Sequence, residues 1–427
     1  MLAVAFLLLI LLLALALPVA AALGVLGLLL EQLYSRMPLS LAMGEIAWSS
    51  SKDFLLVSIP MFILLGEILL RAGVAERMYD AMIKWLSWIP GGLMHSNIGA
   101  CAIFAATSGS SVATAATVGT VALPLVKRHG YNERLFLGTL AAGGTLGILI
   151  PPSINMIIYA VLTDTSIPKL YLAGIFPGLA LAALFMLTVA VLCILRPGWG
   201  GRKLPADWGQ RIASLIHLLP PLFIFLIVVG SIYAGFATPT EAAALGVVAS
   251  LGLAWGFGRL SLAMLREVVE NAMRTTAMVM LIIVGAYFLN FVMSAIGLTA
   301  ALTTFIAGLG LSKLEMLLAV IVFYVILGCF METLSMMITT IPIVAPVMFQ
   351  LGFDPVWFGI VIVILIEAAL ITPPVGLNLF VVQSLRKGGS LNDVIVGSLP
   401  FVLAMFVMLA VLVAFPGIAL WLPAQFS

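Results

Sequence analysis

The feature that most constrains this chain is a pair of double-proline breaks that recur at matching places in its two halves. Pro124 and Pro151 recur as Pro346 and Pro373 at one constant offset of 222 residues. The second proline of each set opens a Pro-Pro pair inside an apolar stretch, so it interrupts a hydrophobic helix. Matched interruptions in the two halves of an apolar chain are typical of secondary transporters built from repeats.

The composition places the chain in a membrane. It is 63% hydrophobic and 8% charged, with a mean hydropathy of +1.27, so too few polar side chains remain to cover a water-soluble core. Apolar runs near the roughly 20 residues that cross a bilayer recur along its length. We therefore predict one all-α polytopic membrane protein with about ten crossings. They are expected at residues 2–16, 18–34, 53–71, 133–166, 171–195, 212–236, 240–257, 275–296, 355–385 and 394–422.

Two further apolar segments, residues 92–126 and 314–349, are polar at their centres. Thr107 to Ser111 interrupt the first, and Glu332 to Ser335 interrupt the second. Polar backbone at membrane depth is tolerated where protein or a water-filled cavity satisfies it. We therefore predict two re-entrant hairpins, each followed by a broken helix at a Pro-Pro pair. Mixed segments are expected to lie flat as arms at 40–51, 74–87, 261–273 and 298–310.

The positive residues predict the orientation, because cytoplasmic loops collect Lys and Arg. With this topology, the 19 positive residues lie on one side of the membrane, taken as the cytoplasmic side, except for four. These four are Arg36, Lys52, Lys169 and Lys313. Both termini then lie outside, and the two hairpins enter from opposite faces, which makes an inverted-topology repeat. The first residues lack a charged start and a cleavage pattern, so we expect a retained helix.

The hairpin tips and helix breaks carry the candidate cation ligands. Hydroxyls at Ser108, Ser110 and Ser111 lie at the first tip, opposite a glycine-rich stretch that leads to Ser153. Prolines free the carbonyls upstream of each break, and such oxygens suit a hard cation such as sodium. The second site would use Glu332, Thr333, Thr372, Pro373, Gly376 and Asn378. The alternative is that small residues such as Ala115 to Thr117 only let membrane helices pack closely.

The half-helix N-termini could hold an anionic substrate, because they present positive dipole ends where the apolar segments carry almost no cationic side chain. Asn155 and Asn378 are the best substrate-side candidates, although an amide that bridges each break is the structural alternative. Ser110, Pro152 and Pro374 complete the predicted substrate contacts.

Four acids need separate interpretation. Glu67, Glu241 and Glu367 lie in or beside apolar helices, where an ionisable residue is costly. Glu241 follows Thr238-Pro239-Thr240 and is expected to cap a helix, while Glu67 is either a proton site or a hydrogen-bonded packing residue. Asp164 is expected to be solvated.

Other functions find little support in the sequence. Neither the cysteines nor the histidines have metal-ligand spacing, the small net charge of +2 does not suggest nucleic-acid binding, and no catalytic triad or phosphate-binding loop is present. We therefore predict no enzyme, no catalytic residues, no transition metal and no direct use of ATP. The residues concerned are Cys101, Cys193, Cys329, His95, His129 and His217.

Five motifs together resemble the large permease subunit of tripartite ATP-independent periplasmic (TRAP) transporters, of the dicarboxylate type within the ion transporter superfamily. The resemblance covers essentially the whole length. The motifs are Ile59 to Glu67, Ser108 to Ser111, Ile150 to Ser153, Ala173 to Gly178 and Ala237 to Ala243.

The resemblance implies sodium-coupled uptake of an organic acid, such as a C4-dicarboxylate or sialic acid, across the bacterial inner membrane by an elevator movement. It implies a small four-helix membrane subunit, as a separate polypeptide, and a periplasmic binding protein as partners, with sodium as coupling ion and no other cofactor. By position, one implied sodium site is Ser108, Ser111, Gly147, Ile150 and Ser153; the other is Glu332, Thr333, Thr372 and Gly376. The second tip departs from a pattern of hydroxyl side chains alone, because it contains the carboxylate of Glu332.

The expected division has scaffold helices and an arm at 1–91, the transport core of repeat 1 at 92–170, and scaffold helices and arms at 171–313. The core of repeat 2 follows at 314–388 and a C-terminal scaffold helix at 389–427. Two other functions remain open: a stand-alone anion carrier coupled to protons through Glu67 or Glu332, and a membrane receptor or channel without coupled transport.

Overall fold

The regular elements in the described part of the chain are all helices, joined by turns and short loops. This computed structural model describes residues 1–15, 17–202, 207–308, 310–328, 331–374, 376–386 and 388–426. The first half contains α1 (Leu2–Ala14), α2 (Val19–Tyr34), η1 (Leu39–Ala42), α3 (Met43–Ser51), η2 (Phe54–Val57), α4 (Ser58–Arg71), α5 (Val74–Leu86), α6 (Leu93–Ser108), α7 (Ser111–His129), α8 (Glu133–Leu149), α9 (Ile154–Thr163), α10 (Ile167–Leu195) and η3 (Pro197–Trp199). The second contains α11 (Trp208–Ser214), η4 (Leu215–Leu218), α12 (Leu219–Phe225), η5 (Leu226–Gly230), α13 (Ser231–Tyr233), α14 (Pro239–Gly256), α15 (Leu262–Ala295), α16 (Leu298–Gly308), α17 (Lys313–Gly328), α18 (Thr333–Gln350), α19 (Pro355–Ile371), α20 (Leu377–Ser384), α21 (Leu391–Ala414) and α22 (Gly417–Gln425).

The order of helices repeats at the offset found in the sequence. Shifting α8 by 222 residues reproduces the bounds of α19, and the same shift aligns the other helices to within a few residues. The matched pairs are α2 with α14, α5 with α16, α6 with α17, α7 with α18, α8 with α19, α9 with α20, and α10 with α21. The repeat is therefore present in the element order as well as in the prolines.

The hairpin tips and helix breaks fall where the sequence places them. α6 and α7 meet at Gly109 and Ser110, and α18 begins at Thr333 after the second tip. α8 and α9 are bent by 43° across their break, while residues 372–376 separate α19 from α20. Both Pro-Pro bonds, Pro151-Pro152 and Pro373-Pro374, are cis.

The structure supports the repeat more firmly than it supports the predicted number of membrane crossings. Among the described residues, six helical stretches are long and apolar enough to cross a bilayer, and α8 with α9 makes a seventh if the bent pair is one span. Ten crossings, the orientation of the termini and the inverted relation of the repeats stay predictions. Lys203 and Lys387, which entered the orientation argument, and Cys329, which entered the argument on metal-ligand spacing, lie outside the described residues.

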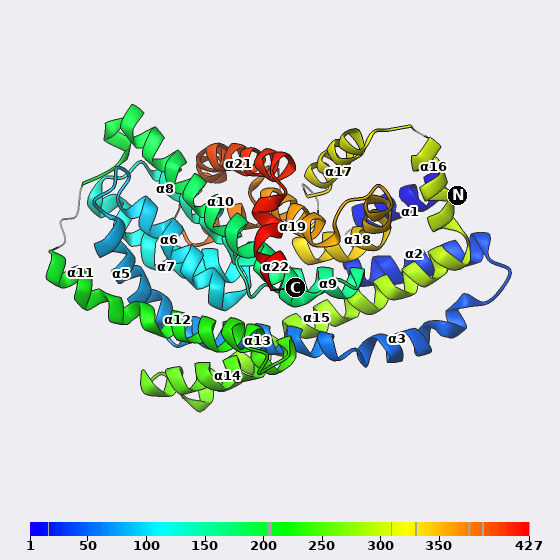
Figure 1. The fold of residues 1–427 in the computed structure, drawn as a ribbon, viewed down its shortest axis with the longest axis horizontal. Coiled ribbons are helices and arrows are strands. Elements are labelled where there is room, and N and C mark those ends of the chain that lie inside the picture. Colours follow the sequence, from blue (N-terminus) through cyan, green and yellow to red (C-terminus); the bar gives the residue numbers. More distant parts are fainter. Residues whose placement is uncertain are drawn as a thin grey trace.

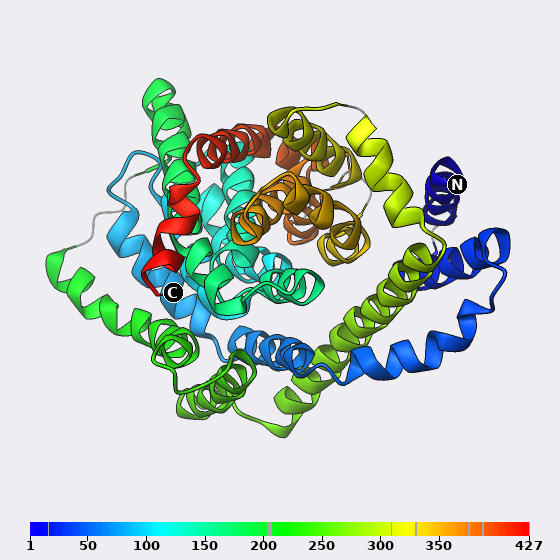
Figure 2. The ribbon, with the colours of Figure 1, turned by 45° about the vertical axis from the view of Figure 1, so that its right-hand side comes forward.

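Two helix boundaries differ from the sequence-based expectation. The predicted arm at 261–273 and crossing at 275–296 form one continuous helix, α15, because nothing near Arg274 breaks a helix. The predicted crossing at 394–422 is divided at Phe415 and Pro416 into α21 and the short α22. Figure 2 shows α15 as one long yellow-green rod that runs diagonally through the lower right of the view.

The helices form two groups. α2 packs along α15, and its repeat partner α14 packs along α4. In the other group, α6, α7, α10 and α21 all pack against α8, while α17, α18 and α21 pack against α19 (Figure 1). α10 and α21 thus lie beside the helices of the two breaks, and the predicted division of the chain into scaffold and core stays a prediction.

Candidate functional site

The first hairpin tip is a tight turn that rests on the first helix break. Gly109 ends α6 with φ 61°, a left-handed conformation that suits glycine. A methyl group there would come within 3.0 Å of the Pro152 carbonyl oxygen. Ser110 then caps α7 by accepting a 3.4 Å hydrogen bond from the Ala113 amide. The tip therefore contacts the Pro-Pro break directly.

Oxygen atoms converge at this tip. The Ser108 and Thr114 hydroxyl oxygens lie 2.9 Å apart, and the Thr114 hydroxyl donates to the Ser110 carbonyl at 2.7 Å. Gly147 of α8 closes the cluster, since a methyl group there would lie 2.5 Å from the Ser110 carbonyl oxygen. Hydroxyl and carbonyl oxygens are ligands for a hard cation. Thr114 was missed in the sequence, although it lies four residues after Ser110 and hence on the same helix face.

The first break is enclosed by its own helices. The Ser153 hydroxyl donates to the Ile148 carbonyl at 2.5 Å and accepts from the Met156 amide at 3.4 Å, which caps α9. Ile150 ends α8 and packs against Gly178 of α10. Ser111 and Pro152 are also buried. Of the predicted ligands, Ser108 and Gly147 are brought together around the Ser110 carbonyl, whereas the Ser153 hydroxyl bonds within its own break.

The second tip is capped by an acid. Glu332 occupies the N-cap of α18, at the position that Ser110 occupies before α7. Its carboxylate accepts hydrogen bonds from the Leu334 amide at 3.0 Å, the Ser335 amide at 2.6 Å and the Ser335 hydroxyl at 2.5 Å. The negative charge thus lies at the positive end of a helix, which stabilises the start of α18.

A cavity of about 230 Å³ lies between the second tip and the second break. It brings together Glu332 and Thr333 of the tip and Gly376 of the break. The Thr372 hydroxyl instead donates to the Ala368 carbonyl at 2.6 Å, and Pro374 is exposed. The full lining is Gly328, Met331, Glu332, Thr333, Met336, Ala369, Leu370, Gly376 and Leu377. This cavity combines an acid, a hydroxyl and helix-end backbone in one small space.

The two predicted substrate-side asparagines differ in their surroundings. The Asn378 side-chain amide donates to the Ala141 carbonyl of α8 at 3.2 Å, so it ties the break of repeat 2 to repeat 1. Gly144 leaves the room for this contact, because a methyl group there would lie 3.2 Å from Asn378 Nδ2. Asn155 is also buried, but its Nδ2 has no hydrogen-bond partner among the described residues.

The acids outside the tips have distinct partners. Glu67 pairs with Arg71 at 2.5 Å, and Arg71 also pairs with Glu267 of α15 at 2.8 Å. Glu241 forms a capping box with Thr238 at the start of α14, which confirms its predicted capping role. Asp164 is exposed, as predicted. Glu367 is fully buried in α19, and neither carboxyl oxygen has a hydrogen-bond partner among the described residues.

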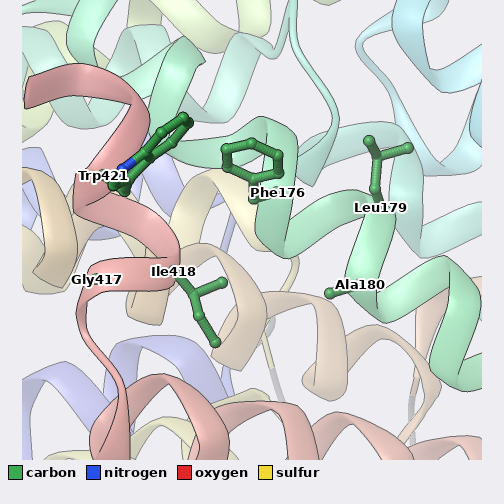
Figure 3. A pocket seen from close by; sticks show the side chains of 6 residues that line it. All are labelled: Phe176, Leu179, Ala180, Gly417, Ile418 and Trp421. Carbon is green, nitrogen blue, oxygen red and sulfur yellow. The ribbon is translucent and has the colours of Figure 1, made fainter. Parts of the chain in front are cut away.

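A larger hollow, of about 680 Å³, lies on the outer surface between α10 and α22. Figure 3 shows the Phe176 and Trp421 rings side by side, with Leu179 beyond Phe176 and with Ala180 and Ile418 below. Its lining carries no charged side chain and none of the tip or break residues. The smaller cavity at the second tip is therefore the better candidate for an ion or a polar substrate.

Comparison with known proteins decides the family. Residues 6–418 match the family model described as "Tripartite ATP-independent periplasmic transporter, DctM component". The chain belongs to the DctM family. A C4-dicarboxylate TRAP transporter large permease from Pseudomonas aeruginosa is 37% identical over 88% of this chain and 88% of its own length. A sialic acid TRAP transporter large permease from Vibrio cholerae is 31% identical, covering 88% of this DctM-family chain and 87% of the relative.

A solved structure shares the fold of this DctM-family chain. The YdaH transporter of Alcanivorax borkumensis, described as having an unusual topology, matches with a TM-score of 0.55 over 87% of this chain and 89% of its own. The sequences are 14% identical, so the likeness concerns the fold alone.

Proposed function

We propose that this DctM-family permease takes up an organic acid together with sodium ions across the bacterial inner membrane. A periplasmic binding protein would deliver the substrate, and a separate four-helix membrane subunit would complete the transporter. Both termini would face the periplasm. The relatives' names include a C4-dicarboxylate and sialic acid, so a carboxylate is the shared chemistry that we assign to the substrate.

The observation that carries this proposal is the tip-and-break pair that the chain builds twice at one offset. Each pair has side-chain oxygens beside an interrupted helix. Ion sites of secondary transporters are made in this way, because interrupted helices present free carbonyls and amides at membrane depth. We assign one sodium to the Ser108, Ser111 and Gly147 region and one to Glu332, Thr333, Thr372 and Gly376. Asn155, with its unpaired amide, is the preferred substrate contact.

The proton-coupled alternative through Glu67 or Glu332 is less well supported. Glu67 is paired with Arg71, and Glu332 accepts three hydrogen bonds as a helix cap. Both carboxylates are therefore held by partners close to them, and neither stands free for a separate role in the cycle. A receptor or channel would not need two matched tips.

The proposed movement is an elevator in which the hairpins and breaks slide against the scaffold. The packing supports counting α10 and α21 with the moving core, because both lie against α8 and α19. α2, α4, α14 and α15 would form the scaffold. Gly66 of α4 would be a sliding contact, since a methyl group there would lie 2.9 Å from the Ser108 carbonyl oxygen.

The test is the thermal stability of the purified protein in sodium chloride against potassium chloride at equal ionic strength. A ligand that binds only the folded state stabilises it by RT ln(1 + [L]/Kd), or about 2.7 kcal/mol at 100 times Kd. We expect a sodium-specific rise that shrinks in Ser111→Ala and in Thr333→Ala. Ser51→Ala is the matched control, since this exposed hydroxyl bonds only to its own helix. Equal melting of the original protein in both salts would refute sodium coupling.

A further inference from the structure

Glu367 is a buried acid that the proposed sodium and substrate sites do not use. It is the thirteenth of 17 residues in α19 and has no solvent exposure. Neither of its carboxyl oxygens has a hydrogen-bond partner among the described residues, and no ion pair involves it. An isolated charge inside a membrane protein is costly, so such a residue needs a ligand or a function.

The helix geometry points Glu367 away from the second cavity. Ala369 faces α17, where it touches Gly328, and Glu367 lies about 160° around the helix from it at 3.6 residues per turn. Gly359 faces Tyr159 of α9 and Leu170 of α10, and Trp357 donates to the Leu412 carbonyl of α21. Glu367 lies between these two directions, about 80° from each. It therefore points into the packed interior, on the side opposite the candidate sodium ligands.

Among the described residues, the helices packed against α19 place no positive charge that could balance an ionised Glu367. The helices packed against α19 are α8, α9, α10, α17, α18, α20, α21 and α22, and the last turn of none of them carries Lys or Arg. Their charged residues all lie in first turns, while Tyr159 and Tyr324 are already hydrogen-bonded to Pro355 and Thr340. The ionisable residues on these helices are Glu133, Arg134, Tyr159, Lys169, Tyr171, Cys193, Lys313, Glu315, Tyr324 and Asp393. A proton bound to one carboxylate oxygen would neutralise the buried charge without any partner from the protein.

The repeat offers an independent comparison. The offset of 222 places Thr145 of α8 at the position of Glu367, and the Thr145 hydroxyl donates to the Ala142 carbonyl of its own helix at 2.8 Å. A carboxylic acid, unlike a carboxylate, also carries an O–H donor and can satisfy a carbonyl of its own helix in the same way. A protonated Glu367 and Thr145 would therefore each carry one O–H donor at this position.

We propose that Glu367 is a proton-binding site of the transport core. It carries a proton in the conformation described here, as an un-ionised carboxylic acid, and exchanges it with water when the core moves. The reaction is the addition of one proton to one carboxylate oxygen and needs no other reactant. This site is separate from the sodium ligands, and the proposal stands whether or not sodium is the coupling ion.

The test is infrared spectroscopy of the purified full-length protein at neutral pH, in water and then in deuterium oxide. We expect a carbonyl band of an un-ionised carboxylic acid that shifts on deuteration and disappears in Glu367→Gln. Glu367→Thr, which copies Thr145, should lose the same band and provides a second variant if the glutamine form folds poorly. Glu31→Gln is the matched control, because this buried acid of α2 accepts a hydrogen bond from Ser40, and it should retain the Glu367 band.

Three results would overturn the proposal. A wild-type spectrum without an un-ionised acid band would mean that Glu367 is charged, and this result does not depend on any variant. A band that survives both Glu367 substitutions would belong to another acid. A Glu367 band that stays unshifted in deuterium oxide would show a static proton rather than an exchanging site. Unchanged sodium-dependent melting in these variants separates this test from the sodium test.

Discussion

The two tip-and-break pairs share one backbone plan but differ in how closely they pack. At the first pair, Gly143, Gly144 and Gly147 of α8 face Cys101, Ala115 and Ser110 of the hairpin, and there is no space for added methyl groups. The offset of 222 replaces these glycines with Leu365, Ile366 and Ala369 in α19. α17 and α18 pack less extensively on α19 than α6 and α7 do on α8, and the 230 Å³ cavity lies between the second tip and break. Three substitutions along one helix face thus distinguish a closed site from an open one.

The largest expected effect on stability comes from replacing Gly144 of α8 with isoleucine, the residue at the matching position of α19. Gly144→Ile would place its Cβ 2.6 Å from the Ala115 Cβ, so α7 and α8 must separate. We expect a loss of about 3 kcal/mol in stability from overpacking, together with a weaker sodium response, measured by thermal unfolding in both salts.

The matched control for this substitution is Gly252→Ile in α14, where nothing lies within 4 Å of the added carbon. It should melt close to the original protein. If Gly144→Ile melted as the control does, close packing of α8 would not distinguish the two sites.

A smaller effect is expected from the two helix caps at the tips. Glu332→Ala removes three hydrogen bonds from the start of α18 and should lower stability by about 2 kcal/mol, the upper end for an N-cap. Ser110→Ala removes one long hydrogen bond and should cost about 0.5 kcal/mol. Denaturant or thermal unfolding in potassium chloride measures both without the sodium contribution.

Glu332→Gln provides the control for the cap, because it keeps an acceptor oxygen but loses the charge. Its melting temperature should fall between those of the original protein and Glu332→Ala. Equal losses for Ser110→Ala and Glu332→Ala would show that the acid contributes nothing special to the second tip.

The smallest expected effect separates the two asparagines. Asn378→Ala breaks the hydrogen bond to Ala141 and should lower stability by about 1 kcal/mol more than Asn155→Ala, whose amide Nδ2 has no partner to lose. The same atoms are removed in both variants, so the difference in melting isolates the bond. Equal destabilisation would argue against Asn378 as a tie between the repeats.

Sequence reasoning predicted the repeat, the tips and the breaks, because each depends on local signals. Prolines, small residues and cap residues such as Asn132 and Asp354 act within a few positions along the chain. The break between α3 and α4, which separates a predicted arm from a predicted crossing, also has a local cause. Asp53 caps η2 and separates α3 from α4, whereas Thr275 occupies the matching position and α15 continues through it.

The contacts between distant segments could not be predicted in the same way. Nothing in the sequence near Asn378 indicates that its side-chain amide reaches Ala141 of the other repeat. The sequence near Glu332 likewise did not indicate that its carboxylate caps α18. Such roles depend on which helices meet in space. The glycine differences between α8 and α19 were visible in the sequence, but their meaning depends on knowing that both helices face the hairpins.

The junction of α8 and α21 has a consequence for following the protein in motion. Gly138 and Gly397 bring the two backbones so close that a methyl group on either would overlap a carbonyl oxygen of the other helix. Arg134 and Asp393 are paired at 2.9 Å at the same end. The two helices therefore have no room to slip past each other and behave as one rigid body. A fluorescent label near the C-terminal end of α21 would report displacement of the first helix break from a distance, without disturbing either tip.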